Sequence, residues 1–317
     1  MIAYLGIDVG SVSTNIVVVS QSREILADLY IRTRGRPLEA ILSGLNEIAG
    51  LIPGDVEIAG AGSTGSGRYL AGVMVGADVI KNEITAHAVA ASMYVPEVQT
   101  VLEIGGQDSK IIIMRQGIVT DFAMNTVCAA GTGSFLDQQA SRLNIPIADF
   151  GELALSSSSP VRIAGRCTVF AESDMIHKQQ MGHKLADIIN GLCEALVRNY
   201  LNNVGKGKEI LPPVVFQGGV AANAGIKAAF ERALKMPVII PRHFNVMGAI
   251  GAAQLAREEV EKTGATRFKG FKITGLPYRT RSFECSGCPN NCEIAEIHEE
   301  DRVIGRWGAR CQRWDVI

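Results

Sequence analysis

The chain has 317 residues, with 31 basic and 32 acidic side chains and hydrophobic residues at 47% of positions. That length predicts roughly two domains with buried cores, and the balanced charge excludes a general attraction to nucleic acid or to an anionic membrane. Met1 to Leu5 lead directly into Asp8 without a basic region, so no signal peptide is expected, and no apolar run approaches the ~20 residues of a membrane span. We therefore expect a cytoplasmic protein whose seven cysteines are free thiols or metal ligands rather than disulfides.

The first expected element is a short apolar strand that begins at Tyr4 and ends in Asp8-Val9-Gly10-Ser11, followed by a return strand over 15–19. Backbone amides in such a glycine turn can approach phosphate oxygens, and an Asp carboxylate can hold a hydrated magnesium ion. The pattern recurs as Glu103-Ile104-Gly105-Gly106-Gln107-Asp108, with a return strand over 111–114. This recurrence predicts a duplicated domain with a phosphate-binding hairpin in each half.

Residues 37–52 carry apolar side chains at helical spacing and predict an amphipathic crossover helix, and 82–95 predict a helix of small residues. Between them, the strand over 56–59 leads into the run from Gly60 to Gly65, which matches G-x-G-x-x-G. An alternative is therefore a dinucleotide site with an acid such as Glu83. It is less favoured because the run does not open a βαβ unit, and the two hairpins already account for nucleotide phosphates.

Two cysteines stand in similar settings, Cys128 within 125–133 and Cys167 within 164–173, each just before a predicted helix start. The dipole and free N–H groups of a helix N-terminus favour a thiolate and an anionic iron–sulfur cluster. Two cysteines are half of a four-thiolate set, which a twofold axis between two subunits would complete. A single chain that pairs them with two cysteines of its C-terminal tail remains an alternative.

The remaining elements follow in order. Helical patterns cover 133–143 and a long segment, 177–204, in which Cys193 is expected to be a core thiol, and Pro146 begins a separate segment through Leu155. A strand that begins at Val214 leads into a glycine turn at Gly218 and Gly219, which opens a helix and can present backbone amides to adenosine or phosphate. A strand over 238–241 and a closing helix over 246–262 complete this part of the chain.

Together, several motifs resemble the activators of 2-hydroxyacyl-CoA dehydratases and the ATPase subunits of benzoyl-CoA reductases: Asp8–Ser11, Gly105–Asp108, Cys128–Gly133, Cys167–Glu172 and Gly218–Asn223. This BadF/BadG/BcrA/BcrD-type family belongs to the acetate and sugar kinase, Hsp70 and actin superfamily, and the resemblance covers about residues 1 to 260. It implies an α/β protein with a duplicated, two-lobed ribonuclease H-like fold. The expected division is a first lobe (1–96), a second lobe with the cluster-binding helices (97–245), a closing helix that packs back on the first lobe (246–264) and a Cys-rich metal-binding tail (265–317).

The resemblance also implies the activity. In the family, a homodimer bridges one 4Fe–4S cluster, ATP hydrolysis rearranges the helices at the cluster, and one low-potential electron passes to a partner. The implied partner is a 2-hydroxyacyl-CoA dehydratase, a benzoyl-CoA reductase-like enzyme or a double-cubane-cluster enzyme. The expected electron donor is ferredoxin or flavodoxin, and neither nucleic acid nor membrane is an expected partner.

Carried over by position, Cys128 and Cys167 would ligate the cluster, Asp8 would position Mg²⁺, and Gln107 and Asp108 would lie by the γ-phosphate and the attacking water. The wider set expected to contact ATP or ADP comprises Gly10, Ser11, Ser13, Thr14, Gly105, Gly106, Lys110, Gly218, Gly219 and Asn223. The family commonly has Asp where this chain has Glu103, so the role of Glu103 is left open.

The tail departs from the compact activators. Cys285, Cys288 and Cys292, with the more distant Cys311, form a plausible four-ligand set for zinc or for a second iron–sulfur cluster, and the spacing does not separate the two. Two other functions stay open. One is a sugar or acid kinase of the same superfold with Asp108 as base; the other is a nucleotide-controlled binding module that recognises a partner through its tail.

Overall fold

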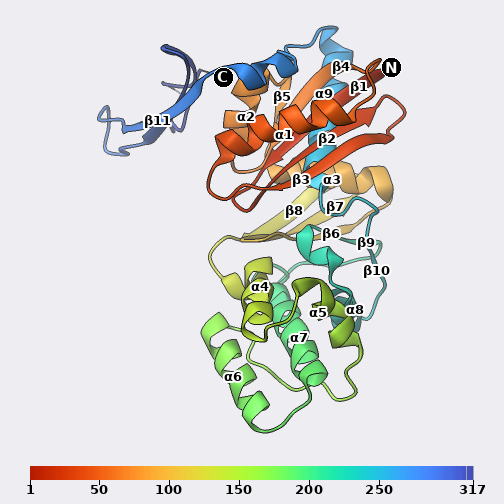
Figure 1. Cartoon of the computed structure of the whole chain (residues 1–317). Helices are drawn as coiled ribbons and strands as arrows, with labels where there is room; N and C mark the ends of the chain where they lie inside the picture. Colours follow the sequence, from red (N-terminus) through yellow and green to blue (C-terminus); the bar gives the residue numbers. More distant parts are fainter. Residues whose placement is uncertain (312, 317) are drawn as a thin grey trace. The chain divides into compact units, whose positions relative to one another are not determined.

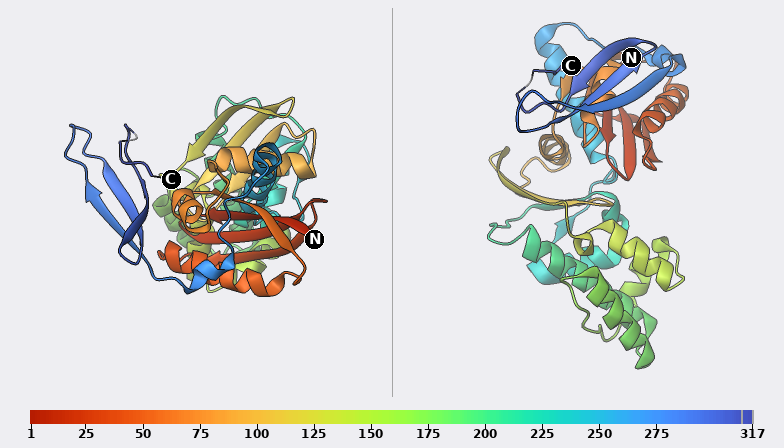
Figure 2. Two further views of the ribbon diagram at one scale, coloured as in Figure 1. Left: turned by 90° about the horizontal axis from the view of Figure 1, so that it is seen from above. Right: turned by 90° about the vertical axis from the view of Figure 1, so that its left-hand side faces the viewer.

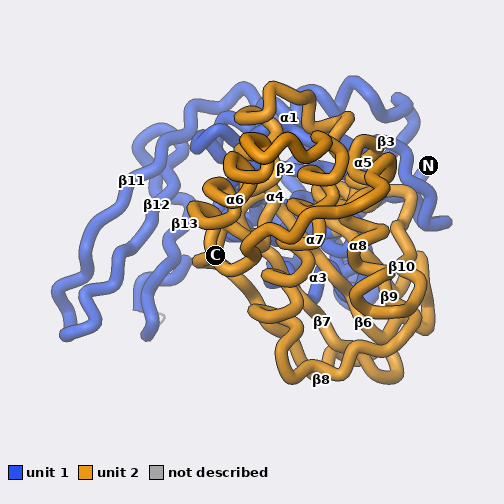
Figure 3. Tube along the Cα trace, turned by 90° about the horizontal axis from the view of Figure 1, so that it is seen from below, with its two compact units in different colours: residues 1–90, 248–317 blue, residues 91–247 orange. Residues whose placement is uncertain are grey.

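The computed structural model describes residues 1–311 and 313–316. The chain divides into two compact units, unit 1 with residues 1–90 and 248–317 and unit 2 with residues 91–247 (Figure 3). Unit 1 is therefore assembled from both ends of the sequence, whereas unit 2 is one continuous segment. Each unit contains its own five-stranded mixed sheet.

Unit 1 has the strand order β3-β2-β1-β4-β5, in which β1 to β3 form antiparallel hairpins and β4 runs parallel to β1. Its core joins the inner face of β1 to the apolar stripe of α1, where Ile41, Leu45 and Ile48 are fully buried. The elements of the sheet and its helices are β1 (Ile2–Val9), β2 (Ser13–Ser20), β3 (Ile25–Arg32), α1 (Pro37–Leu51), β4 (Glu57–Thr64), α2 (Arg68–Val75), β5 (Val79–Ile80), α3 (Glu83–Tyr94, which continues into unit 2) and α9 (Met247–Thr263).

The glycines of the 60–65 run let helix α9 approach the sheet closely. A Cβ at Gly62 would overlap the carbonyl oxygen of Ala252, and one at Gly60 would lie 3.0 Å from a methyl of Val260. Gly6 on β1 meets the carbonyl of Ala249 in the same way. At Gly60 and Gly62 this packing, rather than a cofactor, accounts for the absence of side chains, which removes the support for the dinucleotide alternative.

Unit 2 repeats the arrangement, since its order β10-β9-β6-β7-β8 is that of unit 1 read from the other edge. Strands β6, β7 and β8 are antiparallel hairpin neighbours and β9 runs parallel to β6. The elements are β6 (Thr100–Ile104), β7 (Ser109–Arg115), β8 (Ile118–Asn125), η1 (Ala129–Gly131), α4 (Gly133–Arg142), α5 (Ile147–Leu155), α6 (Thr168–Gln180), α7 (Leu185–Asn203), β9 (Val214–Gln217), η2 (Gly219–Ala222), α8 (Ala224–Leu234) and β10 (Val238–Ile239).

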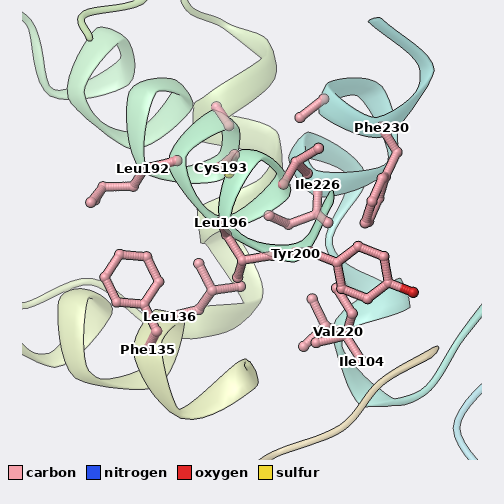
Figure 4. Close-up of a cluster of buried hydrophobic side chains, with 14 of the residues drawn as sticks. Ile104, Phe135, Leu136, Leu192, Cys193, Leu196, Tyr200, Val220, Ile226 and Phe230 are labelled. Carbon is pink, nitrogen blue, oxygen red and sulfur yellow. The ribbon is translucent and has the colours of Figure 1, made fainter. Parts of the chain in front are cut away.

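Helix α7 is the centre of the core of unit 2 (Figure 4). Its residues Leu196 and Tyr200 are fully buried, and the ring of Tyr200 meets that of Phe230 on α8 edge to face at 5.3 Å. The phenolic hydroxyl of Tyr200 donates a hydrogen bond to the carbonyl of Lys110 at 2.6 Å. Helix α7 is thereby tied to the start of β7, and Cys193 is the buried core thiol that the sequence predicted.

The prediction of one long helix over 177–204 is wrong. Helix α6 covers Thr168–Gln180, and α7 starts only at Leu185. Gly182 adopts a φ of +79°, and Lys184 is extended. Because an apolar pattern with helical spacing can continue across a turn, periodicity alone did not show the break.

The tail folds into a three-stranded antiparallel sheet within unit 1, which the sequence analysis did not predict (Figures 1 and 2). Its strands, β11 (Tyr278–Glu284), β12 (Glu293–Glu299) and β13 (Arg302–Trp307), follow the short helix η3 (Phe271–Gly275). Ile297 joins the core cluster of unit 1, and the ring of Trp307 stacks on Tyr69 of α2 at 6.4 Å. Among the described helices, none has the length and apolarity needed to cross a membrane.

Candidate functional site

The two predicted phosphate hairpins are closed by equivalent backbone hydrogen bonds. In unit 1, the N–H of Gly10 donates to the carbonyl of Ser13 at 2.8 Å; in unit 2, the N–H of Gly105 donates to the carbonyl of Asp108 at 3.0 Å. These bonds close equivalent turns between β1 and β2 and between β6 and β7. The sequence repeat is therefore also a repeat of turn geometry, as the duplicated fold predicted.

The acidic residues of the two hairpins also occupy equivalent positions. Asp8 on β1 pairs in register with Thr64 on the parallel strand β4, and Glu103 on β6 pairs in register with Gln217 on the parallel strand β9. A glycine follows each parallel strand, Gly65 with φ +87° and Gly218 with φ +88°. These left-handed conformations favour glycine, because a Cβ is strained there.

Glycines also surround the carboxylate of Asp8. A Cβ at Gly65 would overlap Oδ1 of Asp8, and a Cβ at Gly248, at the start of α9, would overlap Oδ2. The sequence analysis named neither Gly65 nor Gly248 as a site residue. Gly65 could have been found by matching it to Gly218 in the second half, whereas the approach of Gly248 depends on the packing of α9.

The residue across the hairpin differs between the halves. Asn15 pairs with Asp8, but Lys110 pairs with Glu103. The Nζ of Lys110 is 3.1 Å from Oε2 of Glu103 and 2.9 Å from Oδ2 of Asp108, and both Lys110 and Glu103 are 4% exposed. Glu103 is thus half of a buried ion pair.

The charge state of this cluster follows from its geometry. Burial alone would lower the pKa of Lys110, but attraction to Glu103 and then to Asp108, with the hydrogen bonds that Lys110 donates to both, outweighs it and raises that pKa. Lys110 therefore stays protonated and remains bonded to both carboxylates, and its ammonium group orients the carboxylate of Asp108.

The other predicted nucleotide contacts have varied settings. Ser11, Gln107 and Gly219 are exposed. The hydroxyl of Thr14 is instead buried against the hydroxyl of Thr33 at 3.0 Å. Asn223 caps α8, its side-chain oxygen accepting the N–H of Ile226 at 3.1 Å.

The predicted phosphate turn of unit 2 is hydrogen-bonded to the start of α4, the helix that follows Cys128 and η1. At the start of α4, the N–H of Gly133 donates to the carbonyl of Gly105 at 2.9 Å and the N–H of Ser134 donates to that of Gly106 at 2.8 Å. Cys128 directly precedes the turn η1, which leads into α4. A displacement of the phosphate turn would therefore be transmitted to the cysteine loop by two backbone hydrogen bonds.

Cys167 directly precedes α6, as predicted from its setting, whereas Cys128 precedes only the three-residue turn η1, and α4 begins at Gly133. Cys128 is the cap residue of η1 and Cys167 that of α6, both with extended backbone and both half-buried. The Sγ of Cys128 lies 3.9 Å from the carbonyl oxygen of Arg166, the residue before Cys167. The two cysteine loops are therefore neighbours within unit 2.

A side chain that the sequence analysis did not name joins these loops. The Nδ2 of Asn199 on α7 donates to the carbonyl of Gly165 at 2.6 Å and lies 3.7 Å from the Sγ of Cys128. Asn199 is 4% exposed. Asn199 is one of three buried polar residues of α7, with Asp187 and Asn190, so the sequence pattern alone did not single it out.

Apolar side chains next to both cysteines face solvent. Val127 is 94% exposed, and Val169 and Phe170, which follow Cys167, are 68% and 65% exposed. Of the residues of α6, only Ala171 and Met175 are buried. Exposed apolar residues gathered around two thiols are typical of a protein interface.

The tail cysteines lie at the far end of the small sheet, in the turn between β11 and β12 and in the segment after β13. Cys285 and Cys292 are half-buried, and Cys288 and Cys311 are exposed. Within residues 1–311 and 313–316, no group of three or more His, Cys, Asp or Glu side chains is already arranged to hold a metal ion.

The chain is similar to proteins of known activity. It is 38% identical over 266 residues to the (R)-2-hydroxyglutaryl-CoA dehydratase activating ATPase of Acidaminococcus fermentans, covering 81% of this chain and 98% of that protein. It is 32% identical to the 2-hydroxyisocaproyl-CoA dehydratase activator of Clostridioides difficile, covering 82% of this chain and 96% of the activator.

Two solved structures of dehydratase activators are also similar to this chain. The crystal structure of component A of the Acidaminococcus fermentans dehydratase matches with a TM-score of 0.74 at 35% identity, over 82% of this chain and all of that one. The Clostridium difficile activator with bound ADPNP also has a TM-score of 0.74, at 32% identity, over 83% and 97% of the two chains. The family model described as the BadF/BadG/BcrA/BcrD ATPase family matches residues 5–256. The chain belongs to this ATPase family, and its fold is that of the activator ATPases.

Proposed function

We propose that this protein is an ATP-hydrolysing activator that delivers a low-potential electron from a 4Fe–4S cluster to an iron–sulfur partner enzyme. The partner would be a 2-hydroxyacyl-CoA dehydratase, a benzoyl-CoA reductase-like enzyme or a double-cubane-cluster enzyme, with ferredoxin or flavodoxin as the donor. The observation that carries the proposal is the direct bonding of α4, which follows Cys128, to the phosphate turn at Gly105 and Gly106. Nucleotide state and cysteine geometry are thereby connected inside one unit.

For hydrolysis, we assign Mg²⁺ to Asp8, whose carboxylate is surrounded by glycines and pairs across its hairpin with a neutral residue. Glu103 is a poorer candidate, because Lys110 already occupies its carboxylate. In unit 2, Gln107 and Asp108 would orient the attacking water, and the backbone amides of their turn would bind phosphate. Phosphoryl transfer to water depends on this kind of positioning and charge neutralisation.

For electron transfer, the residues present fit an iron–sulfur cluster. Cys128 and Cys167 are soft ligands on two neighbouring loops. Cys167 directly precedes α6, whose free N–H groups and helix dipole favour an anionic group. Two thiolates per chain make half of a set, and the exposed Val127 and Phe170 supply apolar surface for a second copy. Two chains would therefore share one cluster as a homodimer. When bound, the cluster would accept and donate one electron.

The test separates the two halves of the proposal. Protein purified without oxygen should contain about two irons and two sulfides per chain and have the mass of a dimer. Cys128→Ser and Cys167→Ser should lose that iron, whereas Thr126→Ala, an exposed change beside Cys128, should retain it. Iron retained by both serine variants would overturn the cluster assignment.

Asp8→Asn should keep the iron but lose ATP hydrolysis, by about 100-fold or more if Mg²⁺ is held there. The rate of phosphate release with saturating ATP and Mg²⁺ measures this. ATP turnover that required a sugar or acid acceptor and produced its phosphate ester would instead favour the kinase alternative.

A further inference from the structure

The turn between β11 and β12 brings three cysteines onto one short loop. The N–H of Cys285 donates to the carbonyl of Cys292 at 2.8 Å, which extends the strand pairing one step beyond Glu284 and Glu293. Within the loop, the N–H of Asn291 donates to the carbonyl of Cys288 at 3.3 Å. Cys285 and Cys292 are thus cross-strand neighbours, with Cys288 at the bend between them.

The sulfur of Cys285 accepts a hydrogen bond from a neighbouring side chain. The indole Nε1–H of Trp314 points to its Sγ at 3.2 Å. Nη1 of Arg313 approaches the same turn, since a Cβ at Gly287 would lie 3.0 Å from it and 3.4 Å from the Cys285 sulfur. Donors to a cysteine sulfur of this kind stabilise thiolate ligands of metals.

The segment that carries Cys311 returns to the same loop. Trp314 packs edge to face on Phe283 at 5.2 Å, and the guanidinium of Arg306 lies 5.6 Å from the centre of the Trp314 ring. Backbone hydrogen bonds between Arg306 and Val316, both 2.9 Å, fix the other end of the segment. Cys311 therefore belongs to a segment that is held against the cysteine loop on one side and β13 on the other.

We propose that Cys285, Cys288, Cys292 and Cys311 bind one zinc ion. Four thiolates at about 2.3 Å from a tetrahedral ion lie about 3.8 Å from one another, and cross-strand neighbours about 5 Å apart at Cα can supply such a pair. Both loop spacings, C-x2-C and C-x3-C, are those of structural zinc sites; similar cysteine runs hold iron–sulfur clusters, so a cluster is the competing occupant that iron and sulfide analysis distinguishes. Binding releases up to four thiol protons, and Arg313 and the Trp314 N–H donor offset the resulting negative charge.

This site lies outside residues 5–256, which the family model matches, and is independent of the proposed electron transfer. The structure gives it a mechanical role. A zinc ion would join the β11–β12 turn to the C-terminal segment and close one end of a sheet that packs on α2 through Trp307.

The first test uses the unmodified full-length chain, purified without oxygen and stripped of metal. Iodoacetamide labelling with and without added zinc, followed by mass mapping of the peptides, reports each thiol. We expect Cys285, Cys288, Cys292 and Cys311 to become protected together at one zinc per chain, with Cys193 unlabelled throughout because it is fully buried. Labelling of the four that zinc does not change would overturn the site.

Cobalt substitution then counts the ligands, since thiolate-to-cobalt charge transfer absorbs in the near ultraviolet. Cys292→Ser should lose about one zinc per chain and most of that absorption, and Cys311→Ser should lower it by about a quarter or more. Asn290→Ser, an exposed change in the same loop, should retain both signals. An unchanged spectrum for Cys311→Ser would overturn the four-thiolate set.

Iron and sulfide that depend on Cys292 rather than Cys128 would overturn zinc as the occupant. Zinc that depends on Cys292 in a chain without any iron would support this site and contradict the proposed function. The two proposals therefore fail separately.

Discussion

At the scale of single residues, the cluster of Lys110, Glu103 and Asp108 distinguishes the two halves of the fold. Lys110 and Glu103 are both buried, so neither charge is solvated by water. Removing one member of a buried pair leaves the other uncompensated, which commonly costs about 3–5 kcal/mol. The cluster also holds the carboxylate of Asp108, which we place beside the attacking water.

Lys110→Met is therefore expected to lower the free energy of unfolding by about 3 kcal/mol or more and to reduce ATP hydrolysis. The side chain keeps its length but loses the ammonium that pairs with Glu103 and Asp108. Urea unfolding followed by circular dichroism measures the first effect, and phosphate release the second.

The matched control is Lys227→Met, which removes the half-buried pair with Glu231 on α8 and should cost about 0.5 kcal/mol or less. Adding Glu103→Gln to Lys110→Met should restore part of the lost stability. Because the pKa of Lys110 is raised on folding, its contribution is complete below about pH 10 and falls only as the pH rises through the folded-state pKa. The cost of Lys110→Met should thus be the same at pH 6 and pH 9; a cost that changed over this range would contradict the assignment.

At the scale of secondary-structure elements, helix α7 holds the cysteine loops through Asn199. Its amide reaches the carbonyl of Gly165 and the sulfur of Cys128 from a buried position. A Cβ at Gly131 would lie 2.7 Å from its Oδ1, so the loop after Cys128 is packed against the same side chain. Asn199 therefore links the two cysteine loops, in addition to the bonds that Asn125 makes to the backbone of Cys128.

We expect Asn199→Ala to fold and to hydrolyse ATP, but to lose iron to a chelator at least about tenfold faster than the unmodified protein, because ligand-orienting contacts commonly change metal affinity by 10–100-fold. Asn202→Ala, an exposed change on the same helix, is the control. Equal rates of iron loss for all three proteins would show that Asn199 does not position the ligands.

Packing of α9 on the sheet of unit 1 makes a second prediction at this scale. Gly62→Ala should destabilise the protein by about 1–3 kcal/mol or more, since the added methyl overlaps the carbonyl of Ala252. Gly50→Ala, near the end of α1 with open space around it, should instead stabilise by about 0.5–1 kcal/mol. Thermal unfolding of the two variants should show shifts of opposite sign.

At the scale of the whole molecule, a cluster shared between two chains would link iron content to assembly. Complete removal of iron with a chelator should therefore shift the solution mass from two chains to one, or raise the dissociation constant of the dimer. Cys128→Ser should have the mass of the stripped protein. Sedimentation velocity measures both, and a stripped protein that dimerised as tightly as before would mean that the apolar surface, not the cluster, holds the chains together.

Much of the fold was predictable from local patterns. The duplicated hairpins and the two cysteine motifs depend on residues adjacent in sequence, so Asp8, Gly105, Cys128 and Cys167 could be proposed as site residues without a structure. The family resemblance then supplied their expected roles.

What could not be predicted depends on register and packing. The pairing of Lys110 with Glu103 requires the strand alignment of β6 and β7, and the position of Asn199 requires the packing of α7. The break near Gly182 was missed because the apolar residues keep their helical spacing on both sides of it. The three strands of the tail were missed because the prediction for the tail used only its cysteine spacing.

The difference between Lys110 and Asn15 also bears on how the two halves of the fold evolved. Two hairpins with the same turn, register and glycine positions derive most simply from one ancestral hairpin that was copied. In one copy, the position opposite the acid is the neutral Asn15; in the other it is Lys110. A single substitution on the return strand therefore distinguishes the two copies. Asp8 lies opposite an uncharged side chain, whereas Glu103 forms a buried ion pair with Lys110.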